Sequence, residues 1–217
     1  MPSWLPALFC LIFSLSKFNS LWSIPMYQVL ISCKEAAIAA IPLVPIFLIL
    51  HRFKFQSKSR SSIYLILAIY LAAMYAAVGL PDVTYYRYYP RFNFDPFLYM
   101  FSAWETTLLN VLLFLPLGWF LPVLWKKFQS PLQTVCFGFN TSFAVELLQI
   151  FTYRATDVND LMTNTFGTVL GYILGIVTLK VCPKLKAAES HMDLFWVLGA
   201  AFFVMFFIYP FLSMLIQ

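Results

Sequence analysis

Long apolar runs separated by short polar connections divide this sequence of 217 residues. The runs lie at 30–50, 61–80, 105–124, 131–152, 157–179 and 193–216. A helix needs about 20 apolar residues to cross a bilayer, and each run is close to that length. The pattern therefore predicts an all-α fold, a polytopic integral membrane bundle of about six transmembrane helices.

The first 28 residues follow a different pattern. An apolar run at 4–15 is too short to span a bilayer as a helix. We expect an interfacial or re-entrant segment here. The alternative is a seventh span, which would move the N-terminus to the other side of the membrane.

Composition excludes a water-soluble protein. Hydrophobic residues make up 62% of the chain and charged residues only 11%, whereas soluble domains carry roughly 25% charged residues. A chain of this length has no room for a large domain outside the membrane once six spans are counted. The four cysteines show no paired spacing, so a disulfide scaffold is excluded as well.

The charges predict the orientation in the membrane. The connections 51–60, 126–129 and 180–188 hold nine of the 14 Lys and Arg residues. Since they alternate along the chain, they share one side, which the positive-inside rule makes cytoplasmic. Both termini are then expected outside. The net charge of +5 reflects this topology, and we expect no binding of nucleic acid.

The outer connection 81–104 is rich in aromatic residues. It contains Tyr85, Tyr86, Tyr88, Tyr89, Phe92, Phe94, Phe97, Tyr99, Phe101 and Trp104. One interpretation is an interfacial belt on the outer leaflet. The other is a lid, in which Arg87 and Arg91 hold a phosphate or carboxylate of an amphiphile by forked hydrogen bonds.

Polar residues inside the spans fall in register. On a helical wheel the fifth span places one stripe within an arc of about 80°, formed by Asp157, Asp160, Asn164, Gly167, Gly171 and Gly175. Small residues at every fourth position let another helix backbone approach closely. The acids of this stripe are therefore expected to face protein rather than lipid.

The third and fourth spans place polar residues at the same depth. At a rise of 1.5 Å per residue, Asn110, Glu146 and Asn164 each lie roughly 10 Å below the outer end of their helix. On the fourth span, Ser142, Gln149 and Glu146 share a face with Tyr153. The sequence thus predicts a polar cup that opens outward and is covered by the aromatic connection.

Each polar residue also has a plain structural interpretation. Asp157 can cap the N-terminus of the fifth span, with Asp160 in its first turn, and Arg154 can neutralise both acids. The amides of Asn110, Gln149 and Asn164 can simply link helices by hydrogen bonds. Glu146 is the residue that such packing explains least well, because a carboxyl at that depth is costly.

No motif for a metal or a cofactor is present. The two histidines, His51 and His191, lie in predicted cytoplasmic connections, far from the cup. Neither a zinc motif nor a phosphate-binding glycine loop occurs. Asp157 and Asp160 form a D-x-x-D pair, which is a weak signal for Mg²⁺. We therefore expect no metal and no cofactor.

Four elements together resemble the VanZ-like family. They are NFDPF at 93–97, NVLLFLPLG at 110–118, ELLQ at 146–149 and RATDVNDLMTNTFG at 154–167. The resemblance implies a small bacterial multi-pass protein of the inner (cytoplasmic) membrane, in a family whose founding type is linked to teicoplanin resistance. It also implies a family core at 61–180, an N-terminal extension with one span at 1–60, and a cytoplasmic loop with a C-terminal span at 181–217.

Three classes of function follow from these residues. The first is a protein that binds a membrane lipid or a lipid-linked envelope precursor in the cup. The second is an intramembrane enzyme acting on a polyprenyl or glycerolipid phosphate, with Glu146 and Asp160 as acid and base and Arg154 as the phosphate clamp; Asn110 and Asn164 would position the headgroup. The third is an accessory subunit that binds a membrane protein partner.

The topology can be tested by cysteine labelling. In a background without the four native cysteines, a membrane-impermeant thiol reagent added from outside should label Arg91→Cys and spare Lys58→Cys, because the two positions lie on opposite sides. The reverse pattern would contradict the outward-facing cup.

Overall fold

The computed structural model describes residues 5–55, 57–97, 104–152, 154–183, 185 and 187–216, with side chains from residue 27 onward. It consists of seven α-helices, α1 (Leu5–Leu50), α2 (Lys58–Ala77), α3 (Trp104–Leu124), α4 (Pro131–Gln149), α5 (Val158–Val181), α6 (Met192–Phe203) and α7 (Tyr209–Ile216). π-Helical turns at His51–Phe55 and Val204–Ile208 continue α1 and join α6 to α7, and a 3-10 turn at Lys126–Gln129 follows α3. Two short strands, β1 (Phe92–Asn93) and β2 (Thr156–Asp157), pair in parallel. The expected all-α fold is confirmed.

Five helical segments are long and apolar enough to cross a membrane. They are Tyr27–Phe55, Lys58–Ala77, Trp104–Leu124, Val158–Val181 and Met192–Ile216, and they match five of the six expected spans. α4 forms where the remaining span was expected, but it is not among the five segments that are apolar enough. The chain is therefore a multi-pass membrane protein.

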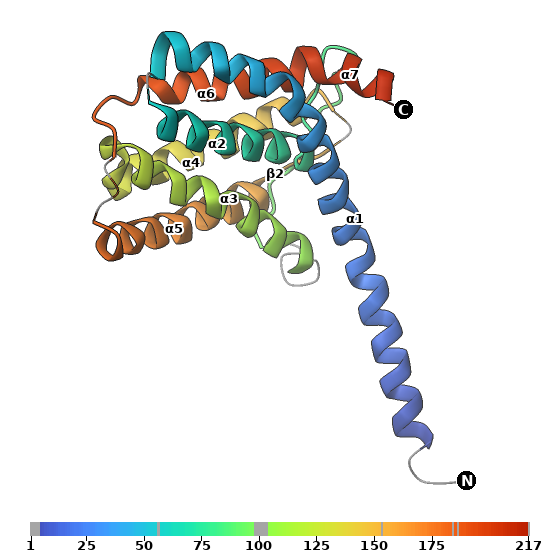
Figure 1. Cartoon of the computed structure of the whole chain (residues 1–217). Helices are drawn as coiled ribbons and strands as arrows, with labels where there is room; N and C mark the ends of the chain where they lie inside the picture. The colour runs from blue at the N-terminus through green and yellow to red at the C-terminus, as the bar shows by residue number, and fades with distance from the viewer. Residues whose placement is uncertain are drawn as a thin grey trace.

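The N-terminal segment differs from the expectation. α1 is one helix of 46 residues, roughly 70 Å long at 1.5 Å per residue, and Figure 1 shows its first part extending away from the bundle. Residues 5–28 thus continue into the first span, and the separate interfacial, re-entrant or seventh segment is not seen in them. No glycine precedes Gly79, and the helix continues through its four prolines, Pro6, Pro25, Pro42 and Pro45.

The second part of α1 belongs to the common core of the bundle. Ala39, Leu43 and Phe47 are buried in one cluster with residues of α2, α3 and α6, such as Leu67 and Val197. The N-terminal helix and the helices that follow it therefore share a single core.

The closest helix pair is α3 with α5, side by side in Figure 1. A Cβ atom added to Gly167 or Gly171 would lie 2.3 or 2.0 Å from the carbonyl oxygen of Val111 or Leu115, respectively. Likewise, a Cβ at Gly118 would lie 2.2 Å from the Thr168 carbonyl oxygen. The two backbones are in direct contact, which confirms the close helix approach expected from the glycine stripe.

The basic connections meet at one end of the bundle. The Lys126 backbone donates to the Ala188 carbonyl at 3.0 Å, and the Ala188 backbone donates to the Leu124 carbonyl at 2.7 Å. Near them, the Tyr64 hydroxyl at the start of α2 donates to Asp193 at 3.1 Å. The basic connections therefore lie at the same end of the bundle, as their alternation along the chain predicted. Lys184 and Lys186 lie outside the described residues.

Filling the α3–α5 contact should destabilise the protein. Gly171→Ala places a methyl group against the Leu115 carbonyl, and overpacking of this kind costs about 1–3 kcal/mol. Gly199→Ala on α6 is the matched control, because its added Cβ meets nothing within 4 Å. Thermal unfolding in detergent, followed by tryptophan fluorescence, measures both. Equal melting temperatures for the two variants would contradict the backbone contact.

Candidate functional site

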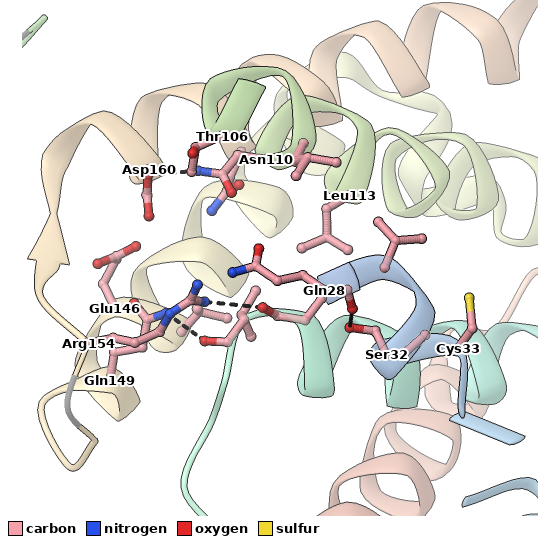
Figure 2. Close-up of a pocket in the computed structure, with 17 residues that line it drawn as sticks. Gln28, Ser32, Cys33, Thr106, Asn110, Leu113, Glu146, Gln149, Arg154 and Asp160 are labelled. Atoms are coloured by element: carbon pink, nitrogen blue, oxygen red, sulfur yellow. Dashed lines mark hydrogen bonds between the residues drawn. The ribbon is translucent and has the colours of Figure 1, made fainter. Parts of the chain in front are cut away.

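A cavity of about 190 Å³ lies within the bundle. Figure 2 shows several of its polar side chains gathered at one end. Six of the nine expected site residues line it, namely Asn110, Glu146, Gln149, Arg154, Asp160 and Asn164. The polar faces of α3, α4 and α5 therefore meet at one level, as the sequence predicted.

Asp160 and Asn110 are joined directly across the α3–α5 contact. The Asn110 side-chain amide donates to Asp160 Oδ1 at 2.7 Å. A carboxylate can only accept hydrogen bonds, so this contact fixes the orientation of the Asn110 amide. The close approach of the two backbones at Gly167 and Val111 holds the pair in register.

Glu146 lines the cavity and is 3% exposed. Its Oε2 accepts a hydrogen bond from the Asp157 backbone at 2.8 Å, and its backbone carbonyl accepts one from the Thr156 hydroxyl at 3.0 Å. Through these two hydrogen bonds, Glu146 links residues 156–157, just before α5, to α4. Figure 2 shows the carboxyl groups of Glu146 and Asp160 at the same end of the cavity.

Asp157 has a capping role and does not line the cavity. It is the N-cap of α5, and its Oδ1 accepts from the Asn159 backbone at 2.8 Å. Its Oδ2 accepts from the Asn93 side chain at 3.0 Å, next to the pairing of β1 with β2. Asp157 therefore caps the N-terminus of α5, as the structural interpretation of the sequence predicted.

Two amide oxygens in the cavity wall have no partner. Gln149 donates to the Val78 carbonyl at 2.8 Å, and Asn164 donates to the Ser142 hydroxyl at 3.0 Å. Both side chains are 3% exposed, and Gln149 Oε1 and Asn164 Oδ1 accept no hydrogen bond from the described residues. The amides do link helices, but only through their nitrogen atoms.

Arg154 lines the cavity and is itself exposed, and Figure 2 shows it at the same end as Glu146. Its guanidinium donates to the Ala77 carbonyl at the end of α2, at 3.1 Å. The turn after α2 makes room for this side chain through Gly79, which has φ +62° and whose added Cβ would lie 3.3 Å from Arg154 Cδ. Among the described residues, the ion pair that forms is between Lys126 and Glu189, at another place in the protein. Arg154 therefore lines the same cavity as Glu146 and Asp160 but forms no ion pair with either of them.

Arg87 and Arg91 lie outside the cavity. The Arg91 guanidinium stacks over the Tyr89 ring at 4.4 Å and donates to its hydroxyl at 2.7 Å. The Arg87 backbone donates to the Phe151 carbonyl at 2.8 Å. Backbone hydrogen bonds of this kind hold the aromatic connection along residues 150–157, and none of its described residues lines the cavity. Within its described residues, 81–97 and Trp104, the connection thus does not form the expected cover of the cup. Tyr99, Phe101 and Tyr153 lie outside the described residues.

α1 forms the wall that the aromatic connection was expected to provide. Gln28, Val29, Ser32 and Cys33 line the cavity, and Figure 2 shows Gln28 reaching toward its polar end. Of these residues, only Gln28 falls in the separate segment expected at residues 1–28, whereas Ser32 and Cys33 fall in the expected span 30–50, to which no site residue was assigned. The available signal was the four-residue spacing of Gln28 and Ser32, which share a helix face.

The described residues hold no group of three or more His, Cys, Asp and Glu side chains that could bind a metal ion. The donors and acceptors of the cavity are instead amides, the hydroxyl groups of Ser32 and Thr106, two carboxyl groups and one guanidinium. Such a set suits recognition of a polar headgroup by hydrogen bonds and charge.

Removing the cap of α5 should loosen the connection that Glu146 binds. Asp157→Ala loses the bonds to Asn159 and Asn93, and loss of an N-cap costs about 0.5–2 kcal/mol. Hydrogen exchange should rise at residues 92–97 and at the start of α5. Asp95→Ala on the same connection is the control, since Asp95 is exposed and only its backbone atoms make hydrogen bonds shown here. If hydrogen exchange rose equally in the Asp157 and Asp95 variants, Asp157 would not be the residue that holds this connection to the start of α5.

Comparison with known proteins identifies the family. A family model described as VanZ/LLP1 matches residues 6–180, a range that includes all four elements noted in the sequence and most of α1. Neither the curated proteins nor the solved structures contain a match to the chain. The family match covers more than half of the sequence, and its range contains all of the described residues that line the cavity. This chain belongs to the VanZ/LLP1 family.

Proposed function

We propose that this protein binds the polar headgroup of a membrane lipid, or of a lipid-linked envelope molecule, in the cavity between α1 and α5. The observation that carries the proposal is that six amide-bearing or charged side chains, from α3, α4, α5 and the connection before α5, line one cavity. Polar and ionisable groups inside a membrane protein are costly, so a cluster of them around a cavity indicates a function. A polar headgroup would bind among these side chains by hydrogen bonds and charge.

The size and position of the cavity support a lipid ligand. Its volume of about 190 Å³ is several times the roughly 30 Å³ that one water molecule occupies in the liquid. Two of its lining residues on α1, Val29 and Cys33, are exposed on a segment apolar enough to span the membrane. A lipid in the surrounding bilayer therefore has a short path to the polar end.

The family and the basic connections favour the cytoplasmic membrane of a bacterium as the site of this activity. The ligand would then be an envelope lipid, a lipid-linked cell-wall precursor or the lipid tail of a lipoglycopeptide. Binding it would change how the outer surface engages such molecules, and this is the route by which we connect the cavity to the resistance role of the family.

A second candidate is an intramembrane enzyme. The observation in its favour is that Glu146, Asp160 and Arg154 line one cavity, which brings an acid, a base and a phosphate clamp together. It differs from a binding protein in that Glu146→Gln or Asp160→Asn would abolish turnover of a polyprenyl or glycerolipid phosphate without loss of the fold.

Native mass spectrometry of the purified protein in mild detergent tests the proposal. Wild type should retain a phospholipid or polyprenyl phosphate, and the Glu146→Gln, Asp160→Asn double variant should lose most of it, because both acids line the cavity. The matched control is Glu105→Gln with Asp193→Asn. Glu105 is likewise buried and Asp193 likewise bonded, but neither lines the cavity.

Equal spectra from the wild type and an equally stable double variant would contradict the proposal. They would mean that the polar residues serve only packing, as in an accessory subunit that binds a membrane protein partner. Comparable melting temperatures for all variants are required before the spectra are compared.

A further inference from the structure

One side of α4 faces out of the bundle. Between residues 136 and 147, the exposed side chains are Cys136, Phe139, Asn140, Phe143, Ala144 and Leu147. They fall within an arc of about 140° on a helical wheel. The buried residues of α4 lie outside this arc, and α4 packs mainly against α5. The arc, named here the outward face of α4, is thus not covered by the described part of the chain.

Asn140 places an amide near the centre of the outward face. It lies at the midpoint of Pro131–Gln149, roughly 14 Å from either end of the helix, and so at the depth of the hydrocarbon centre. Its Nδ2 donates to the Cys136 carbonyl, one turn earlier, at 2.7 Å. No other hydrogen bond joins this side chain to the described residues. By contrast, the amides of Gln149 and Asn164 belong to side chains that are 3% exposed.

An exposed amide at this depth indicates a protein partner. Hydrocarbon offers no hydrogen bonds, so a polar group that faces it is costly. Asn side chains within membranes instead form hydrogen bonds between helices. α4 follows the basic turn at 126–129 and leads to the outer connection, yet it is not among the segments apolar enough to span the membrane. A helix of this polarity suits a position between protein surfaces.

The two flanks of the outward face differ in shape. On one flank, a groove of about 360 Å³ separates α4 from α2 and α6, with Asn140 and Ala144 on its α4 side and Phe202 on its α6 side. On the other flank, the rings of Phe139 and Phe143 stack with their centroids 6.4 Å apart and form an exposed ridge. Asn140 therefore lies between a ridge and a groove.

We infer that the outward face of α4 is an interface between two copies of this chain, related by a two-fold axis along the membrane normal. Such an axis sets a residue beside it opposite its own copy. An amide both donates and accepts, so two facing Asn140 side chains satisfy each other. The same rotation sets the ridge of each copy against the groove of the other. The face is thus complementary to itself in both hydrogen bonding and shape.

Cross-linking in membranes tests the interface. Cys136 lies on the outward face, one turn from Asn140. With the other three cysteines replaced by Ser, a short membrane-permeant bifunctional thiosulfonate should link two copies through Cys136, because packed helices lie about 8–10 Å apart. The matched control lacks all four native cysteines and carries Val177→Cys, which is exposed on α5 at a similar depth. It should give much less dimer.

Substitution of Asn140 tests its role. Asn140→Leu removes the hydrogen bond between copies and should raise the dissociation constant of the dimer roughly tenfold. Gln133→Leu is the control, since Gln133 is also exposed on α4 but lies near its cytoplasmic end, where water reaches the amide. It should change the dissociation constant little. Native mass spectrometry over a range of protein concentrations measures the dimer fraction, and melting temperatures confirm that both variants are folded.

Three results would overturn the inference. One is cross-linking at Cys136 no stronger than in the Val177→Cys control. Another is an equal dimer fraction in wild type and a folded Asn140→Leu variant. The third is a cross-link from Cys136 to a polypeptide of another mass in place of a second copy. None of them bears on headgroup binding, because the outward face does not line the cavity.

Discussion

The backbone contact between α3 and α5 determines the rest of the site. Gly167, Gly171 and Gly118 have no side chains, so carbonyl groups of one helix lie where a Cβ of the other would be. In a bilayer there is little hydrophobic drive to bring helices together, and close packing of small residues supplies the attraction. Because the contact allows little sliding, Asn110 on α3 is held opposite Asp160 on α5.

From that pair the polar contacts continue into the neighbouring elements. The Asp157 cap begins α5 and is bonded through its backbone to Glu146 on α4, and through its side chain to Asn93 of the aromatic connection. Gln149 then bonds to the end of α2. The side chains of Glu146, Gln149 and Asp160 thus both link the helices at this end of the bundle and line the cavity.

The sequence predicts much of this arrangement because helical periodicity and depth are simple functions of residue number. These two quantities were enough to predict the polar stripe on α5 and the common depth of Asn110, Glu146 and Asn164. The wall formed by Gln28 and Ser32 could not be placed in the same way, since it depends on α1 continuing through residues 5–50 and on where it packs. The aromatic connection was misplaced because its position follows from backbone bonds such as Tyr89 to Ile150, which leave no periodic signal.

A crystal structure of the protein grown from a lipidic phase, with a bacterial lipid extract present, tests the central claim most directly. We expect a headgroup in the cavity with polar atoms within hydrogen-bond distance of Glu146, Asp160 or Arg154. A cavity closed by its own side chains, with Arg154 paired to Glu146 or Asp160, would contradict headgroup binding at this site.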